Sequence, residues 1–302
     1  MINRDLIENY SFYTINIKYE NISALLDHIY SLFDKDAILL DYGHSTDVSP
    51  VQEQRVQYYF VGNAINFSFW FDKYDEKYQF NNLSGSEAMW DVLQRNQELL
   101  DAEYLKNIEQ TKFREMFGNM PMEDKRIEQL CEAGKVLTQR YNGKAINILR
   151  EADYKIENII REISSNFELW NDSYGGIHFY KRIQAFINCI LNDSICRSIV
   201  DKTGIEKMTI LADYHIPKLF RHYEILEYSE DLKHKVDDGI SLNSGSIEET
   251  DIRIATILVG IELLEKMNQS SFVITPSTLD GILWREARKI KVPYHLCKSI
   301  WY

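Results

Sequence analysis

The sequence predicts a mainly α-helical protein that folds as a single compact domain over residues 1–302, and three observations support this. Glycine (13 residues) and proline (5 residues) are scarce for 302 residues, where an average composition would supply roughly twenty and fifteen. Apolar residues recur at intervals of three and four along most of the chain, which is typical of amphipathic helices. No internal repeat, low-complexity tract or linker rich in proline, glycine or serine divides the sequence, so we expect one domain.

The N-terminal region is expected to form a helical cap of about residues 1–50 on the main helical body. Residues 22–33 place apolar side chains at helical spacing behind Asn21, which is a suitable helix-capping residue. A polar loop is expected to follow over residues 41–50. We include this cap in the single domain that spans the chain.

The strongest signal for β-structure lies between residues 57 and 80. Residues 57–71 are rich in aromatic and β-branched side chains and are interrupted at Gly62, and such a stretch is typical of a strand. Residues 77–80 could pair with it across a short loop. The sequence therefore predicts one small β-hairpin or sheet near residues 57–80 in an otherwise helical protein.

Helical patterns fill most of the chain after residue 84. Ser84 and Glu87 have the spacing of a capping box, as do Ser246 and Glu249, so each pair predicts the start of a helix. Pro217 suits the first turn of a helix, because its missing N–H costs nothing there. The predicted helices cover residues 84–100, 122–142, 143–166, a segment from about 180, a segment after 217, 248–267 and 279–287.

Charge and cysteine content argue against several classes of function. The chain has 34 basic and 46 acidic residues and a net charge of −12, which repels polyanions unless the basic residues gather on one face. We therefore expect a small-molecule partner and no extended nucleic acid. The four cysteines have neither the spacing of a metal site nor that of a disulfide framework, so we expect no metal and a reducing, cytoplasmic location.

The sequence also predicts neither a signal peptide nor a membrane span. The first five residues lead into charge with no apolar stretch behind them. The longest apolar run, residues 254–264, is interrupted by Thr256 and Glu262, so we do not expect it to cross a membrane.

One carboxylate stands out as a candidate for chemistry. Asp213 lies between a short apolar run and Pro217, beside Tyr214, and burial there would raise its pKa and disfavour its charge unless the carboxylate is paired or used. About thirty residues upstream, two aromatic residues are followed by Lys181 and Arg182, which could supply a counter-charge and a stacking surface. Together the two segments predict a site for chemistry.

Each of these residues also has an ordinary structural interpretation. Asp213 could simply cap the helix after Pro217, and Lys181 could be a solvated helix residue whose stem covers apolar surface. His44 is a lone histidine in a loop, which is more often a surface residue than a catalyst. Trp70 and Trp284 belong by default in a core. The residue types by themselves leave these alternatives open.

Taken together and in this order, several segments resemble the queuosine salvage protein family, the queuosine 5'-phosphate N-glycosylases. The resemblance runs from about His44 to Tyr302, and His215 stands where an arginine is more usual. The segments that carry it are Asn66-Phe67-Ser68-Phe69-Trp70, Phe179-Tyr180-Lys181-Arg182, Ala212-Asp213-Tyr214 with Pro217, Tyr228-Ser229-x-x-Leu232, the helix opening from Glu249 to Arg253, Asp280-x-x-Leu283-Trp284 and the closing Tyr302.

The resemblance implies a mostly helical fold similar to that of DNA glycosylases, and hydrolysis of an N-glycosidic bond without a cofactor. The implied substrate is queuosine 5'-monophosphate, queuosine or a related nucleoside, and the product is queuine, a 7-deazaguanine-type base. The resemblance implies Asp213 as the catalytic carboxylate and Lys181 as its charged partner, with His44 in the pocket. Lys181 could instead bind the substrate phosphate. The sequence does not decide the oligomeric state.

The implied reaction passes through a transition state with oxocarbenium character, which a fixed carboxylate near the anomeric carbon stabilises. Whether Asp213 acts as a nucleophile, a general base or an electrostatic stabiliser stays open. Asp251 or Asp280 could accept hydrogen bonds from the exocyclic amine and ring N–H of the base. The remaining residues expected to bind substrate are Ser68, Phe69, Trp70, Tyr180, Tyr214 and Trp284, most of them rings suited to a flat base.

Three other classes of function remain alternatives. The chain could bind a nucleoside or nucleotide without turnover, with Asp213 as a recognition group. It could be a glycosylase that acts on a flipped base in nucleic acid, although the net charge of −12 opposes this. It could also be a helical interaction protein with no ligand.

Overall fold

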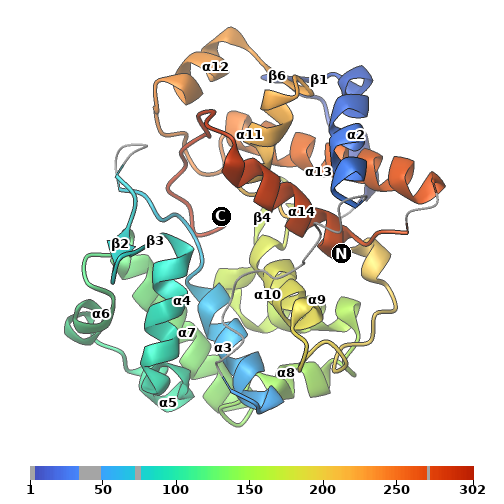
Figure 1. Cartoon of the computed structure of the whole chain (residues 1–302). Coiled ribbons are helices and arrows are strands. Elements are labelled where there is room, and N and C mark those ends of the chain that lie inside the picture. Colours follow the sequence, from blue (N-terminus) through green and yellow to red (C-terminus); the bar gives the residue numbers. More distant parts are fainter. Residues whose placement is uncertain (1–3, 34–48, 72–75, 271–272) are drawn as a thin grey trace.

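Helices account for most of the computed structural model, which describes residues 4–33, 49–71, 76–270 and 273–302 (Figure 1). The mainly α-helical fold predicted from the sequence is confirmed. The α-helices of the described residues are α1 (Arg4–Glu8), α2 (Ile22–Phe33), α3 (Gln52–Ala64), α4 (Ser86–Arg95), α5 (Ala102–Lys106), α6 (Gln110–Phe117), α7 (Glu123–Arg140), α8 (Ile146–Glu151), α9 (Ile156–Asn166), α10 (Lys181–Asn192), α11 (His215–His222), α12 (Glu230–Asp237), α13 (Ile247–Gln269) and α14 (Pro276–Lys289).

The strands of the described residues form three antiparallel pairs of short strands. Two of them are hairpins, and the third joins the N-terminal region to a segment more than two hundred residues later. The pairs are β1 (Ile15–Ile17) with β6 (Leu226–Tyr228), β2 (Gln79–Phe80) with β3 (Leu83–Ser84), and β4 (Ser173–Tyr174) with β5 (Ile177–His178).

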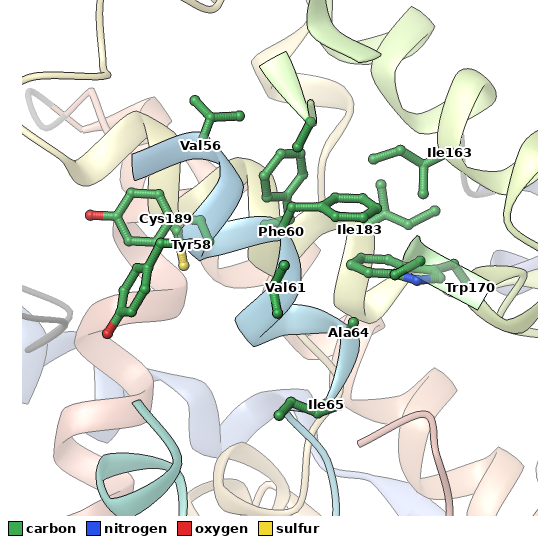
Figure 2. Close-up of a cluster of buried hydrophobic side chains, with 14 of the residues drawn as sticks. Val56, Tyr58, Phe60, Val61, Ala64, Ile65, Ile163, Trp170, Ile183 and Cys189 are labelled. Carbon is green, nitrogen blue, oxygen red and sulfur yellow. The ribbon is translucent and has the colours of Figure 1, made fainter. Parts of the chain in front are cut away.

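The strand predicted over residues 57–71 is wrong, because most of this stretch belongs to the helix α3. Residues 55–64 are all buried, so α3 has no polar face and lacks the periodicity that normally marks a helix. Figure 2 shows Val56, Phe60 and Ala64 of α3 among other buried side chains. The small hairpin does exist, but it is formed by β2 and β3, extended by an isolated bridge between residues 70 and 77.

Two further helix boundaries differ from the predictions, and one agrees. Helix α4 begins at Ser86 rather than Ser84, because Ser84 pairs in β3 and Gly85 adopts a positive φ of 59° between them. The helix predicted over residues 143–166 is divided into α8 and α9 by Asp153 and a neighbouring residue, both with positive φ. Ser246 caps α13 as predicted, accepting a hydrogen bond from the following helix at 3.2 Å.

The first of two large hydrophobic clusters surrounds α3. It includes side chains of α4, α5, α7, α8, α9 and α10, which occupy the lower half of Figure 1. Phe60 stacks face to face on Trp170, with ring centroids 4.9 Å apart and planes 7° from parallel (Figure 2). Each fully buried side chain of this size stabilises the fold by about 1.5–3 kcal/mol relative to exposure, so α3 anchors this half of the molecule.

The second large cluster is built on α11, α13 and α14, in the upper half of Figure 1. Helix α2 contributes Ile22, Leu25 and Ile29 to it, and β1 joins it through its pairing with β6. A smaller cluster contains Ile7 of α1 together with Phe179. The N-terminal elements therefore pack on the C-terminal helices.

No helix within the described ranges is both long enough and apolar enough to pass through a bilayer.

Candidate active site

A pocket lies where the two large hydrophobic clusters approach one another. It contains about 880 Å³ of space not filled by atoms, including its open mouth. The lining residues are Asn63, Asn66, Phe69, Lys77, Ser84, Ser86, Glu87, Lys181, Ala185, Asn188, Cys189, Leu211, Asp213, Tyr214, His215, Asp280, Trp284, Arg288 and Tyr302.

Helical spacing explains why α10 and α14 each supply several of these residues. Lys181 and Asn188 of α10 are seven residues apart and therefore project from the same face of the helix. Asp280, Trp284 and Arg288 of α14 follow one another at intervals of four. Each helix thus presents one polar stripe to the pocket while its other faces pack in a core.

Asp213 both caps a helix and lines the pocket. It lies two residues before α11, is 7% exposed, and accepts hydrogen bonds through Oδ1 from the backbone N–H groups of His215 (2.8 Å) and Ile216 (3.0 Å). Burial raises the pKa of Asp213, while the charge of Lys181 and these two N–H groups act in the opposite direction. The charge of Lys181 and the two N–H groups thus offset part of the cost of burying this carboxylate.

Lys181 is the first residue of α10 and is buried beside the same pocket. Burial lowers its pKa, and the carboxylates of Asp213 and Asp280 oppose that shift. Among the described residues no carboxylate oxygen approaches its ammonium within 4.0 Å. The ammonium of Lys181 and the carboxylates of Asp213 and Asp280 therefore influence one another across the pocket at more than 4.0 Å.

His215 is a neutral side chain in this site. Burial and neighbouring cations, Lys218 first among them, lower its pKa well below the usual value. It lines the pocket, and its Nδ1 has no hydrogen-bond partner among the described residues. An imidazole held neutral can donate and accept a hydrogen bond but adds no charge.

Of the four rings expected to hold a flat base, the structure places three in the pocket. Phe69, Tyr214 and Trp284 line it. Trp70 does not: it packs edge-on against Tyr214, with centroids 4.6 Å apart, and also contacts Tyr294 in the second cluster. Its indole therefore supports Tyr214 from the core, so the role predicted for Trp70 in binding substrate is corrected.

Asp251 is also away from the pocket, although the sequence suggested a role in reading the base. Its two oxygens accept hydrogen bonds from the Tyr10 hydroxyl (2.8 Å), the backbone N–H groups of Tyr13 (2.9 Å) and Thr14 (2.7 Å), and the Thr14 hydroxyl (2.8 Å). These bonds use its acceptor capacity. Asp251 thus holds the N-terminal segment on α13.

Ser68 and Tyr180 were also expected to bind substrate, but both make contacts within the protein. The Ser68 hydroxyl contacts the carbonyl oxygens of Cys297 (3.2 Å) and Ser299 (2.8 Å) and thereby ties the C-terminal segment to the end of α3. Tyr180 stacks on His178 with centroids 5.1 Å apart and precedes α10 in a left-handed conformation. Neither lines the pocket. His44 lies outside the described residues.

Sequence reasoning missed a group of cations at one side of the pocket. The Arg288 guanidinium donates to Glu87 at 2.8 Å and lies over the Trp284 ring at 4.8 Å. Lys77 is half-buried, and burial followed by the charge of Arg288 lowers its pKa. A Cβ on Gly85 would collide with the Lys77 side chain, so this cation lies beside the N-terminus of α4. The interval of four residues between Trp284 and Arg288 places both side chains on one face of a helix, and this spacing could have indicated Arg288 from the sequence.

Residues 46–302 match the family model described as queuosine salvage protein. The chain belongs to the queuosine salvage protein family. Three relatives that carry the name queuosine 5'-phosphate N-glycosylase/hydrolase are similar along most of their length. That of Dictyostelium discoideum is 26% identical over 262 residues, covering 84% of this chain and 80% of the relative. That of Sphaerobacter thermophilus is 28% identical over 268 residues (83% and 82%), and that of Mus musculus is 26% identical over 294 residues (86% and 85%).

In this member of the queuosine salvage protein family, a buried ion pair stands behind Lys181. Asp172 accepts two hydrogen bonds from the Arg253 guanidinium, at 2.9 and 2.5 Å, and one from the backbone N–H of Lys181 at 3.4 Å. Arg253 also lies 3.9 Å over the Phe179 ring. The pair connects α13 to the start of α10 and so fixes where Lys181 enters the pocket.

In the parts of this family member that the structure describes, no three His, Cys, Asp or Glu side chains gather as possible metal ligands. The chemistry available at the pocket is that of an anionic carboxylate, an ammonium group and aromatic walls. Such a set binds a planar ligand and stabilises positive charge that develops on it.

Proposed function

We propose that this protein hydrolyses the N-glycosidic bond of queuosine 5'-phosphate and releases queuine for salvage. The single observation that carries the proposal is the buried Asp213 carboxylate, which faces a pocket lined by aromatic rings and an ammonium group. The family of the chain and the names of its relatives identify the substrate class. The partner is thus a small nucleotide, and the four free cysteines accord with a reducing cytoplasmic location.

In the proposed reaction, the bond between C1' of the ribose and the base nitrogen breaks and its electron pair leaves with the base. Positive charge develops on C1' and the ring oxygen, and the Asp213 carboxylate stabilises it. Water supplies the hydroxyl group that ends on C1' and the proton that ends on the base. A 7-deaza base lacks the N7 lone pair at which a purine leaving group can be protonated, so stabilisation at the sugar matters more here.

Lys181 acts in this scheme by keeping Asp213 ionised. Its charge is the largest influence that opposes the raised pKa of Asp213, and Asp280 in turn opposes the lowered pKa of Lys181. One Asp280 oxygen also accepts the backbone N–H of Leu211 at 2.6 Å. We therefore assign Asp280 to positioning of the segment before Asp213 and to support of the Lys181 charge.

The remaining groups suggest how the nucleotide lies. Phe69, Tyr214 and Trp284 are the rings available to stack on the base. Lys77 and Arg288, beside the N-terminus of α4, form the cationic side suited to the 5'-phosphate. A phosphate bound there would also relieve the repulsion between the two cations.

The direct test is incubation of the purified protein with queuosine 5'-phosphate and detection of free queuine by mass spectrometry. Queuosine and a queuosine-containing tRNA serve as comparison substrates, and Asp213→Asn as the control protein. We expect release from the 5'-phosphate and far less from the variant. Absence of release across the pH range would reject the proposal, and tight binding without release would instead indicate a carrier.

A further inference from the structure

One side chain in the pocket has polar atoms that the mechanism does not use. Asn188 of α10 is 1% exposed and lines the pocket. Both its Oδ1 and its Nδ2 lack a hydrogen-bond partner among the described residues, where no other side chain has two such atoms. A buried amide without partners is costly to the fold. An amide at this position therefore requires an explanation outside protein stability.

A second amide from α3 faces the same pocket in a fixed orientation. The Nδ2 group of Asn63 donates to the carbonyl oxygen of Tyr59 at 2.9 Å and to the Cys189 thiol at 3.5 Å. These two bonds show which end of the amide is the nitrogen, so Nδ2 points toward Tyr59 and Cys189. Its Oδ1 is buried and without a partner among the described residues. Because α3 and α10 pack against each other, the two amides belong to one wall.

We propose that Asn188 and the Oδ1 of Asn63 recognise the hydrogen-bonding edge of the 7-deazaguanine base. That edge presents an acceptor (O6) followed by two donors (N1–H and the exocyclic amine). The two amides present the complementary set: a donor and an acceptor on Asn188, and a second acceptor on Asn63. Asn188 thus binds O6 and N1–H, and Asn63 accepts from the amine. The inference rests on the proposed function, which supplies the identity of the base.

This assignment replaces the acidic residues expected to read the base. Asp251 is saturated by the N-terminal segment, and Asp280 is engaged with Leu211 and influences Lys181. A neutral amide also suits the edge better than a carboxylate, because a carboxylate has no donor for O6. Asn188 is therefore a specificity-determining residue, while Asp213 acts at the sugar.

The test measures binding of free bases by calorimetry, which separates base recognition from turnover. Two probes are used: 7-deazaguanine, and 2-amino-7-deazapurine, which keeps the amine but lacks O6 and N1–H. We expect the unaltered protein to bind 7-deazaguanine about tenfold to a hundredfold more tightly than the second probe, which is the range for two buried hydrogen bonds. Asn188→Leu should bind both probes equally weakly, so that the preference disappears.

Asn192→Leu is the matched control, because Asn192 lies one turn further along α10, bonds to Ser277 at 3.1 Å and does not line the pocket. It should keep the preference for 7-deazaguanine. The thermal midpoint of the ligand-free protein should rise in Asn188→Leu and fall in Asn192→Leu, because only the first removes unpartnered polar atoms. A merely structural role for Asn188 predicts a fall in both.

Several outcomes would overturn the inference. The first is an equal affinity of the unaltered protein for the two probes. The second is an unchanged preference in Asn188→Leu, and the third is an equal loss of affinity for both probes in that variant. Should Asn188→Leu fail to fold, Asn188→Ala, with the best helix former, makes the same comparison. Release of queuine without an effect of Asn188 rejects this inference alone, whereas Asn188-dependent binding without release rejects only the proposed reaction.

Discussion

At the scale of single residues, the carboxylate of Asp213 has a structural task and also lines the pocket. Its Oδ1 accepts the first N–H groups of α11, and the same buried group lines the pocket. Hydrogen bonds from the helix N-terminus and the charge of Lys181 favour the ionised form, while burial opposes it. A carboxylate kept in this state is costly to the fold and available to a cation.

Asp213→Asn should therefore reduce activity and increase stability. The amide keeps an oxygen for His215 and Ile216 but loses the charge, so we expect kcat/KM to fall about a hundredfold to ten-thousandfold. Because burial raises the pKa of Asp213 in the folded state, the acid's contribution to stability is lost as pH rises through that pKa. At pH 7 the variant should melt a few degrees higher by calorimetry. A lower Tm would show that the charge stabilises the fold.

Lys181→Met should shift the acidic limb of the profile of kcat/KM against pH to higher pH. The charge of Lys181 is the largest influence that lowers the pKa of Asp213. Without it the carboxylate stays protonated to a higher pH, and kcat/KM should begin to rise later as pH increases. Lys218→Met is the control, because Lys218 is a weaker influence on Asp213 and should shift the limb less. Identical limbs in the two variants would contradict the assignment of Lys181.

At the scale of elements, contacts between helices, rather than helix propensity, decide which residue fits at several positions. Gly134 lies in the middle of α7, where it faces α5 at very close range. A Cβ at this position would collide with the backbone nitrogen of Lys106 and the carbonyl oxygen of Ala102. The glycine is thus required by the approach of two helices, a feature that the sequence pattern of α7 does not reveal.

Gly134→Ala should destabilise the protein although alanine favours helices. The collision involves backbone atoms that cannot rotate away, so we expect a loss of about 1–3 kcal/mol in the free energy of unfolding, measured in urea. Gly260→Ala in α13 is the matched control: the three atoms nearest to its Cβ would all belong to the Ile210 side chain, which can change rotamer. A loss in the control as large as in Gly134→Ala would show that backbone contact is not decisive.

Helix α3 shows the limit of reading elements from periodicity. Its residues 55–64 are buried on all sides, so no alternation of polar and apolar residues records the helical period, and aromatic content predicted a strand instead. By contrast, α2 has an exposed face and α13 has a clear cap, and the sequence located both to within a few residues. Helix α10 is buried along most of its length as well, but its apolar side chains keep helical spacing. Amphipathic helices are predictable because their pattern reports one buried face.

At the scale of the whole molecule, a buried ion pair joins the two halves that border the pocket. Asp172 follows Trp170 of the first cluster, while Arg253 belongs to α13. Both side chains are 3% exposed and share two hydrogen bonds. Asp172 also accepts the backbone N–H of Lys181, so the geometry of the site depends on this connection.

Arg253→Met should destabilise the fold by about 3–5 kcal/mol, because it leaves the Asp172 carboxylate buried and unpaired. Unfolding in urea measures this loss, and adding Asp172→Asn to the variant should restore part of it. Lys125→Met is the control: its pair with Glu128 is half exposed, and we expect a change below about 1 kcal/mol. A small loss in Arg253→Met would mean that water reaches the pair.

The sequence by itself determined the helical class and the main amphipathic helices and singled out Asp213 and Lys181 as candidates, because composition, periodicity and an acid in an apolar segment are local properties. Only the tertiary structure decided which candidates meet: Trp284 and Asp280 enter the pocket, whereas Ser68, Trp70 and Asp251 are used by the core and the termini. Local pattern records whether a residue is buried but not which neighbour covers it. The role of a polar side chain is set by that neighbour, which comes from distant parts of the chain.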